Sequence, residues 1–354
     1  MFVTAITELG GIREGRQSSG PFPQRSVGDH WYPACIAGSV RSRCPSTEVV
    51  MKQISTLAGG WTALAVVCLA LVVVFGTSRY EPAAAQGGPT IIWYDSFDDQ
   101  TPLEQKYFEY DDAGGRFAVV AGVGVNGSPG LRAVYAAGVE DAGHLHRTFG
   151  RNPVNSQGHS TTDFREVYWR LFVKNEAGWS GNPFKLSRVT SFANRSWAQA
   201  MIAHVWAAAS GTTLMLDPAS GVDGNGQLVT TGYNDFAHLR WLGGRDGTTR
   251  VFDASNAGHW YCVESHVKLN SPGASDGVFE FWVDGKLEAG RSDLNWVGTW
   301  AQYGINILMV ENYWNGGPRT QQTRYIDELA VATGRIGCAA GLSPQPPTNV
   351  RVVR

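Results

Sequence analysis

Hydrophobic and polar residues alternate most clearly between residues 258 and 286, in the sequence GHWYCVESHVKLNSPGASDGVFEFWVDGK. Over residues 260–269 the apolar residues fall on one set of alternate positions, with only Ser265 out of place: Tyr261, Val263, Val267 and Leu269. A period of two predicts a strand with one face on a core and the other towards water. A second strand is expected over residues 278–283, with Phe279, Phe281 and Val283 on one face.

Turn-forming residues bound both of these strands. Residues 270–277 (NSPGASDG) combine proline, aspartate and glycine, which supply bends and positive φ angles. After the second strand, Asp284-Gly285 predicts a two-residue primed turn of the kind that closes a hairpin.

Similar short apolar stretches recur along the chain, separated by turns rich in glycine and asparagine. A short strand is expected from Ile91, and Val205 and Trp206 favour a strand over a helix within residues 196–208. The other expected strands cover residues 117–123, 131–136, 144–149, 167–174, 201–208, 213–216, 227–231, 238–242, 305–310 and 324–332. Many short strands at regular spacing predict an all-β fold, a sandwich or jelly roll of two antiparallel sheets.

Composition agrees with a turn-rich β protein. The 354 residues include 43 glycines, 13 tryptophans, 12 tyrosines and 15 phenylalanines, while charged residues make up only 17%. The net charge of −2 and the lack of a basic cluster interleaved with aromatics argue against a nucleic-acid partner. A short uronate-bearing glycan needs only a local basic spot, so an acidic polysaccharide stays compatible with this charge.

The first 85 residues differ from the rest. Residues 1–50 lack sustained periodicity and are interpreted as a disordered upstream extension. Residues 51–85 contain Lys52, an apolar run over 61–75 and the exit Ala83-Ala84-Ala85, which together predict a secretory signal peptide. The alternative is a retained membrane anchor, since residues 57–77 approach the length that spans a bilayer. A secreted or cell-envelope protein is therefore expected, touching a membrane only through this segment if it is not cleaved.

The expected mature domain covers residues 86–340. A proline-rich linker follows over 341–354, and its last residues resemble the start of a truncated fibronectin type III strand. Beyond the cleavage point only Cys262 and Cys338 remain, and two cysteines in an oxidising compartment are more often bridged than free. The alternative is a pair of buried free thiols.

Four motifs occur in a characteristic order: GHWYCVESHVKLN, DGVFEFWVDGK, MVENYWNGG and RYIDELAVAT. On these motifs the chain resembles the concanavalin A-like lectin/glucanase superfamily, and more narrowly its polysaccharide-lyase-like members, which include glucuronan and alginate lyases. The resemblance is specific over about residues 260–338 and diffuse over 91–240. It implies the jelly-roll fold more strongly than an activity, because laminin G-like binding modules share these motifs. The Glu-x-Asp-x-Glu motif of the glycosidase branch is missing from the sequence, which disfavours retaining hydrolysis.

Candidate chemistry lies on the polar faces of the strands. One face of the 260–283 hairpin carries Glu264, His266, Lys268, Glu280 and Trp282. The strand over residues 165–174 repeats the pattern, with Tyr168 and Arg170 facing outward. We expect both sets to line one groove, where tryptophan stacks on sugar rings and the polar residues bind hydroxyls and carboxylates.

A uronate lyase needs a cation to neutralise the substrate carboxylate, a base to remove the adjacent proton and an acid to protonate the leaving oxygen. The candidates for these roles are Arg170, then His266 or His204, then Tyr168 or Tyr313. The residues expected to bind substrate are Trp282, Glu280, Glu264, Lys268, Asn312 and Trp314.

Each candidate also has a structural interpretation. Arg170 could pair with Glu166 or Glu264 at the surface. His204 could be a hydrogen-bonded core histidine, and Tyr313 with Trp314 could cap a loop. Two functions therefore remain open. One is a β-eliminating lyase acting on a uronate polysaccharide, and the other is a non-catalytic laminin G-like carbohydrate-binding module.

Asp327 in the last strand and Asp95 in the acidic turn suggest a structural Ca²⁺ where the first and last strands meet. The alternative is that Asp327 caps a turn and the acidic turn is solvated. Cysteine and histidine spacing shows no zinc pattern. No organic cofactor is expected, and the protein is expected to be a monomer.

Overall fold

The computed structural model describes residues 89–99, 101–155, 158 and 161–341. The expected upstream extension, the hydrophobic segment within 51–85 and the linker from residue 342 onward lie outside the described residues. Within the described part, none of the helices is both long and apolar enough to cross a membrane.

Sheet A contains eight strands, all antiparallel to their neighbours. Strand β1 pairs with β16, beside the main path of the sheet. The bounds are β1 (Ile91–Asp95) and, in spatial order, β14 (Lys286–Leu294), β13 (Gly277–Val283), β12 (Tyr261–Lys268), β6 (Glu166–Asn175), β16 (Gln322–Ala332), β4 (Gly130–Tyr135) and β3 (Phe117–Val120).

Sheet B also contains eight antiparallel strands, and β11 (Arg245–Asp246) pairs with β9 beside its main path. In spatial order the others are β10 (Arg240–Trp241), β9 (Leu214–Ser220), β8 (Gln199–Ala207), β7 (Lys185–Phe192), β15 (Ile307–Tyr313), β5 (Asp141–Thr148) and β2 (Glu109–Asp111). Helices are short: α2 (Leu103–Lys106), η1 (Val125–Gly127) and η2 (Ala254–Asn256).

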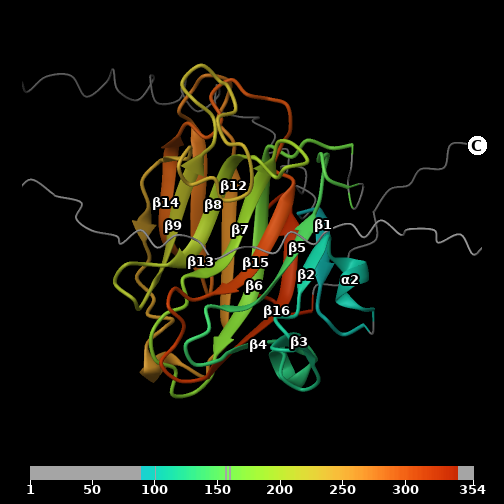
Figure 1. Cartoon of the computed structure of the whole chain (residues 1–354), viewed down its shortest axis with the longest axis vertical. Coiled ribbons are helices and arrows are strands. Elements are labelled where there is room, and N and C mark those ends of the chain that lie inside the picture. Colours follow the sequence, from blue (N-terminus) through green and yellow to red (C-terminus); the bar gives the residue numbers. More distant parts are fainter. Residues whose placement is uncertain (1–88, 100, 156–157, 159–160, 342–354) are drawn as a thin grey trace, which may run out of the picture. The chain divides into compact units, whose positions relative to one another are not determined.

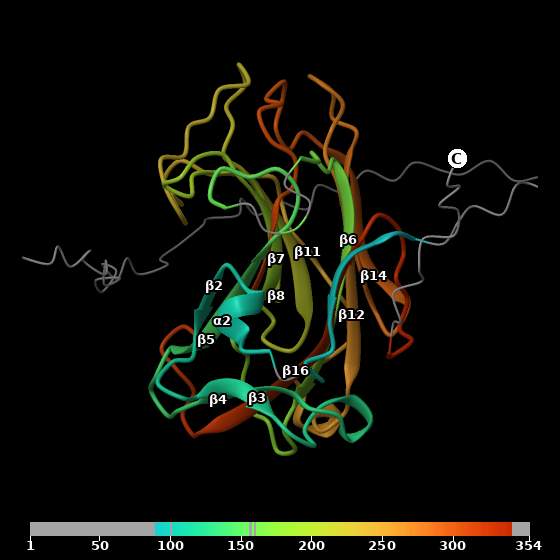
Figure 2. The same cartoon turned by 90° about the vertical axis from the view of Figure 1, so that its right-hand side faces the viewer.

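The two sheets pack face to face, with β7 and β8 on one side of the sandwich and β6 and β12 on the other (Figures 1 and 2). Apolar residues from both sheets fill the space between them, and Trp169 of β6 and Trp296 are fully buried there. The indole Nε1 of Trp169 donates a hydrogen bond to Ser187 Oγ of β7 at 3.2 Å, which joins the two layers. The predicted all-β jelly-roll sandwich of two antiparallel sheets is confirmed.

Most expected strands are present, with shifted ends. One prediction is wrong: residues 227–231 form no strand, and this region contributes only a single bridge between Val222 and Leu228. The strand expected over 238–242 is reduced to Arg240–Trp241. Strands β2, β7, β11 and β14 were not predicted.

The hairpin of β12 and β13 has the register that its alternation demands, with Glu264 opposite Trp282 and His266 opposite Glu280. Strand β13 then turns into β14 through Asp284 and Gly285, whose φ angles are 51° and 79°. Positive φ at both central residues is what a primed turn requires, so the predicted turn is confirmed.

The predicted disulfide is present. Cys262 of β12 and Cys338 are bonded, with their Cα atoms 5.7 Å apart. The bond ties residues 335–341, which follow β16, to the outer face of sheet A; we call residues 335–341 the C-terminal strap.

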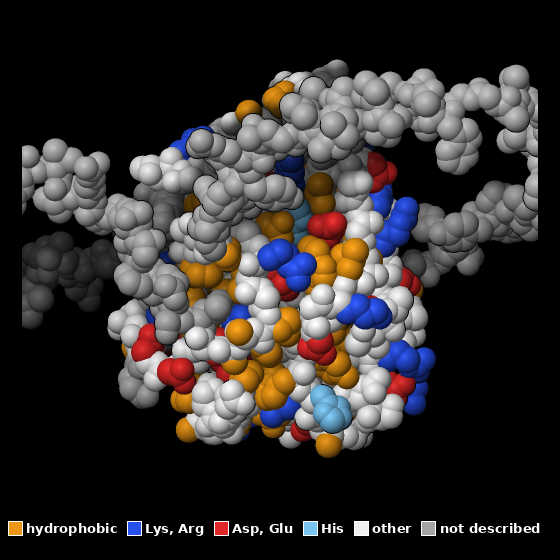
Figure 3. All heavy atoms as spheres, turned by 180° about the vertical axis from the view of Figure 1, so that it is seen from behind, with side chains coloured by type: hydrophobic (Ala, Val, Ile, Leu, Met, Phe, Trp, Pro, Cys, Tyr) orange, Lys and Arg blue, Asp and Glu red, His pale blue; other side chains and the backbone are white. Residues whose placement is uncertain are grey.

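Seen from behind, the molecule shows apolar side chains interleaved with both signs of charge (Figure 3).

We expect loss of this bond to destabilise the domain substantially. The two cysteines are 76 residues apart, and closing a loop of that length restricts the unfolded chain by about 4 kcal/mol in the chain-entropy treatment. Urea unfolding of the oxidised protein and of the Cys262→Ser/Cys338→Ser variant should differ by about 2–4 kcal/mol. A reducing agent should lower the stability of the native protein alone, and an equal loss in the double variant would contradict this assignment.

Candidate functional site

A row of six side chains, five of them ionisable, crosses sheet B at right angles to its strands. Paired positions on β2, β5, β15, β7, β8 and β9 place these residues side by side in the order Glu109, His146, Met309, Arg188, His204 and Asp217. Cross-strand neighbours of this kind lie on one face of a sheet. We call this set the cross-strand row.

Arg188 is the centre of the row and is only 1% exposed. Its guanidinium donates to Glu311 Oε1 at 2.9 Å, and Lys185 Nζ lies 3.1 Å from the same oxygen. Burial alone would raise the pKa of Glu311, but Arg188 and Lys185 hold it well below its ordinary value. Two cations thus share one carboxylate, which leaves the cluster with a net positive charge.

Tyr233 and Asn234 lie over this cluster from the segment between β9 and β10. Arg188 donates to Asn234 Oδ1 at 2.9 Å, and the hydroxyl of Tyr233 donates to Glu311 Oε1 at 2.7 Å. Asn234 adopts φ of 51°, and its backbone N–H donates to Gln199 Oε1 at 2.9 Å. Burial, aided by Glu311, raises the pKa of Tyr233 above its ordinary value, so this hydroxyl keeps its proton.

His204 has a defined tautomer. Its Nδ1 lies 3.0 Å from the carbonyl oxygen of Asp217, which can only accept, so Nδ1 carries the proton. The unprotonated Nε2 faces Arg188 NH1 at 3.4 Å. Burial and the charge of Arg188 lower the pKa of His204 well below 6.5. The result is a neutral imidazole with its lone pair beside a guanidinium.

A strip of stacked rings leads from His204 towards solvent. The ring of Trp206 lies 4.0 Å from that of His204, and Trp241 stacks near both at 5.9 and 5.7 Å. Phe236 extends the strip, 6.2 Å from Trp241. Trp241 is 42% and Phe236 is 45% exposed, so the outer end of this aromatic strip presents ring faces to solvent.

A second polar group lies at the other end of the row. His144 and His146, two residues apart on β5, stack at 4.6 Å beneath Glu109 of β2. Glu109 Oε2 lies 2.7 Å from His146 Nδ1 and 3.8 Å from His144 Nε2. Burial alone would raise the pKa of Glu109, but the two histidines lower it to about 2.

Tyr313 occupies the same face of sheet B, on β15. Lys185 Nζ lies 5.2 Å from its ring centre, and its hydroxyl donates to Glu140 Oε2 at 2.6 Å. Burial and Glu140 raise the pKa of Tyr313 to about 12. Of the predicted catalytic residues, His204 and Tyr313 therefore lie on sheet B.

The other three predicted catalytic residues lie on the outer face of sheet A. The prediction that Tyr168 and Arg170 share the face of the hairpin residues is confirmed by the pairing of β6 with β12. Tyr168 stacks on His266 at 4.1 Å. The two ring nitrogens of His266 contact Glu280 at 3.0 Å and Glu166 at 2.8 Å, so both are occupied by carboxylates.

The C-terminal strap covers part of this face. Arg170 is fully buried and donates to the carbonyl of Ala339 at 2.8 Å and to Glu328 Oε2 at 3.1 Å. Glu264 accepts from Arg335 Nε at 3.0 Å, and the Arg335 guanidinium lies 3.9 Å from the ring centre of Trp282. These expected groove residues therefore bind the chain itself, because the disulfide holds the strap against them.

The remaining predicted binding residues are dispersed. Lys268 is exposed at the end of β12. Asn312 and Trp314 point inward instead: Asn312 Nδ2 donates to the carbonyl of Gly143 at 3.1 Å, and Trp314 packs 5.5 Å from Tyr135. Their burial follows from the regular alternation along β15, which puts residues 312 and 314 on the same inward side as Leu308 and Val310.

The carboxylates expected to hold calcium have protein partners. Asp95 Oδ1 lies 2.5 Å from Lys106 Nζ, and Asp95 Oδ2 accepts from the Tyr107 hydroxyl at 2.9 Å. Asp327 accepts from the backbone N–H of Val125 at 2.7 Å and from Ser128 Oγ at 3.1 Å. A calcium ion at Asp95 would have to displace the lysine, and the calcium site stays a prediction.

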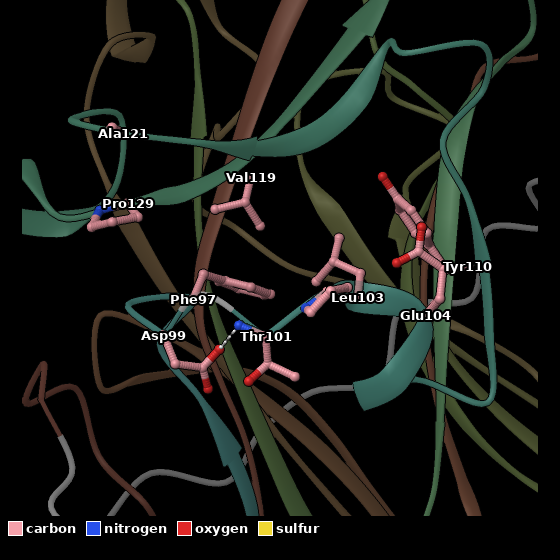
Figure 4. A pocket seen from close by; sticks show the side chains of 10 residues that line it. Phe97, Asp99, Thr101, Leu103, Glu104, Tyr110, Val119, Ala121 and Pro129 are labelled. Carbon is pink, nitrogen blue, oxygen red and sulfur yellow. Dashed lines mark hydrogen bonds between the residues drawn. The ribbon is translucent and has the colours of Figure 1, made fainter.

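A shallow hollow of about 340 Å³ lies beside α2 and β3 (Figure 4). Phe97, Leu103 and Val119 give it apolar walls, and Asp99 accepts a hydrogen bond from the Thr101 backbone at 3.0 Å at its edge. None of its lining residues belongs to the cross-strand row or to the predicted catalytic set.

Several residues of the cross-strand row, and residues that contact it, were not predicted from the sequence. Arg188 lies on the unpredicted strand β7, and Tyr233 lies in a segment without secondary structure. The alternation of His144 with His146 was the one available signal, because residues two apart on a strand share a face.

No family model and no curated protein matches the chain. Similar solved structures include an endo-β-1,4-glucuronan lyase from the fungus Trichoderma reesei, with 15% identity, a TM-score of 0.47, and coverage of 69% of this chain and 96% of that one. Alginate lyase vAL-1 from Chlorella virus shows 13% identity, a TM-score of 0.42, and coverage of 64% and 100%. The marine PL-14 alginate lyase from Aplysia kurodai shows 11% identity, a TM-score of 0.42, and coverage of 69% and 100%. The chain is similar to these lyases in architecture, and at these values the likeness says nothing about its reaction.

The carboxyl of Asp217, at the end of the row, should make stability depend on pH. Burial raises its pKa from 3.8 to about 7 in the folded protein. The free energy of unfolding therefore falls as pH rises from 3.8 through 7. Asp217→Asn removes this loss and should stabilise the protein above pH 7 by up to about 4 kcal/mol, with no gain near pH 3.5. Urea unfolding across this range measures the effect. The exposed control Asp98→Asn should give no such trend, and a gain independent of pH would contradict the assignment.

Proposed function

We propose that the protein is a β-eliminating lyase that acts on a uronate-containing polysaccharide at the outer face of sheet B. The observation that carries the proposal is the meeting of Arg188, the neutral His204 and the protonated Tyr233 in one cluster. These are a cation, a base and an acid, the three groups that elimination beside a carboxylate requires.

In this proposal Arg188 binds the uronate carboxylate and makes the neighbouring C5–H more acidic. His204 Nε2 removes that proton, and its electron pair forms the C4–C5 double bond. The C4–O bond breaks, its electron pair stays on the leaving oxygen, and Tyr233 donates a proton to that oxygen. The net positive charge of Arg188, Lys185 and Glu311 favours an anionic sugar over a neutral one.

Binding needs access to this cluster, since Arg188 and His204 are 1% and 2% exposed beneath Tyr233 and Asn234. The segment between β9 and β10 that carries Tyr233 therefore has to move when substrate enters. The exposed aromatic strip beside it supplies ring faces on which sugars stack.

A second candidate is a non-catalytic glycan-binding module. It is favoured by the closed network around Arg188, whose NH1 and NH2 groups are already engaged by Asn234, Tyr233 and Glu311. Such a module would use the exposed Trp241 and Phe236 and leave the cluster as a structural support. The two candidates separate on one measurement, the ultraviolet absorbance of an unsaturated product from a panel of uronate polymers.

We further propose that the protein is exported. The disulfide between Cys262 and Cys338 supports this, because disulfides form and persist in oxidising compartments.

His204→Ala should abolish eliminase turnover on the polymer that the native protein cleaves, by a factor of about 10² or more, because a general base acts in the transition state. Tyr233→Phe should have a comparable effect through loss of the acid. The matched control is His238→Ala on the same segment, which removes an exposed histidine paired with Asp235. Binding of the polymer by His204→Ala, measured by calorimetry, should stay within a few-fold. Full turnover by the His204→Ala variant would show that His204 is not the base.

The rate of elimination should also change little between pH 6 and pH 5. An ordinary histidine base with a pKa of about 6.5 loses about eightfold of its unprotonated form between pH 6 and pH 5. Because the pKa of His204 is lowered well below 6.5, kcat/KM should stay nearly constant over this window. Asp217, with a pKa of about 7, is already mostly protonated there and does not contribute. An eightfold fall in a protein that stays folded would contradict the role of His204.

A further inference from the structure

Glu109, His144 and His146 bring three metal-binding atoms together on the outer face of sheet B, and we call them the histidine-pair site. One nitrogen of each histidine and one carboxylate oxygen lie within 4.8 Å of one another. The site is fixed by the sheet: the two histidines alternate on β5, and Glu109 pairs directly opposite His146 from β2. The ligands therefore need no loop to position them.

His146 is the unusual member of this set. It is only 2% exposed, yet neither of its ring nitrogens makes a well-aligned hydrogen bond to any residue in the described part of the chain. Glu109 Oε2 is likewise unsatisfied, although it lies 2.7 Å from His146 Nδ1. A buried polar group without a partner is costly. A cation that accepts a lone pair from one nitrogen of His146 and another from Glu109 Oε2 would relieve part of this cost.

We propose that the histidine-pair site binds a divalent transition-metal ion, with Zn²⁺ as its best-fitting occupant. Zinc lies about 2.0–2.2 Å from nitrogen and oxygen ligands, which places neighbouring ligand atoms roughly 3.3 Å apart in a tetrahedral site. The observed separations of 2.7 Å from Glu109 Oε2 to His146 Nδ1 and 3.8 Å to His144 Nε2 bracket that value. Small side-chain movements are enough to admit the ion.

The donor set selects the class of ion. Two imidazoles and one carboxylate suit zinc and its transition-metal neighbours, whereas calcium takes six or more oxygen ligands. Asp111 and Asp141 have carboxylate oxygens within 4.8 Å of a His144 nitrogen, so they can orient this ring from outside the first set of ligands. His144 and Glu109 have side chains that are 24% and 36% exposed, which leaves the fourth coordination position open to solvent.

The test is calorimetric titration of chelator-treated full-length protein with ZnCl₂, followed by Co²⁺ as a spectroscopic probe of tetrahedral geometry. The native protein should bind zinc at this site. His144→Ala and Glu109→Gln should each weaken it by roughly tenfold or more. His259→Ala, which removes an exposed histidine outside the site, should bind as the native protein does. His146 is left unchanged because its burial makes a substitution there a risk to folding.

Zinc held by other parts of the chain would survive in His144→Ala, so only the binding lost in both variants counts for the proposal. Thermal unfolding without metal should show all three variants folded, and zinc should raise the midpoint only in the native protein and His259→Ala. Three results would overturn the proposal: no zinc binding by the native protein, zinc binding that survives both substitutions, or tighter binding of CaCl₂ than of ZnCl₂ by the native protein.

Discussion

The buried charge of Arg188 is the constraint around which sheet B is arranged. A guanidinium taken out of water is tolerated only when a counter-charge and further acceptors surround it. Here the counter-charge comes from Glu311 on β15, and the acceptors come from Tyr233 and Asn234 between β9 and β10. The Arg188 side chain on β7 therefore joins β15 and the irregular segment between β9 and β10.

The two outer faces of the sandwich carry similar residue types and differ in what covers them. On sheet A, the C-terminal strap binds Arg170 and Glu264 and is fixed by Cys338. On sheet B, hydrogen bonds to Glu311 and Gln199 hold the covering residues Tyr233 and Asn234 in place. Within the described residues, no disulfide fixes them. Because hydrogen bonds to a ligand can replace such contacts, the outer face of sheet B is the one on which we propose the reaction.

The fold could be predicted from the sequence where alternation was regular. The pairing of β12 with β13 and the shared face of β6 follow from residues two apart, and the primed turn at Asp284 follows from the Asp-Gly pair. Strand β7 could not be predicted in this way, because the buried Ser187 interrupts its apolar face and Arg188 sits on its outer face although it is buried. Burial of a charged residue depends on partners from distant strands, which a local pattern does not contain.

The site was harder to predict than the fold for the same reason. The face of His266 and Trp282 was identified, but its covering by the strap depends on contacts between residues about 70 positions apart, such as Glu264 with Arg335. The zinc-type ligands escaped notice because Glu109 is far from His144 in sequence and meets it only through the pairing of β2 with β5. Chemistry assembled across strands has no fixed spacing along the chain.

The straightness of the cross-strand row has a consequence for ligand length. Six side chains on six neighbouring strands span five inter-strand spacings, which is about 24 Å. Arg188 and His204 lie towards one end, and Glu109 and His146 lie at the other. His146 and Arg188 are separated by two of these spacings, about 10 Å, so a ligand has to extend at least that far across the strands to contact both groups. The two groups differ, one being a guanidinium cluster and the other two imidazoles with a carboxylate, so the proposed substrate would meet them in opposite order in the two directions along the row.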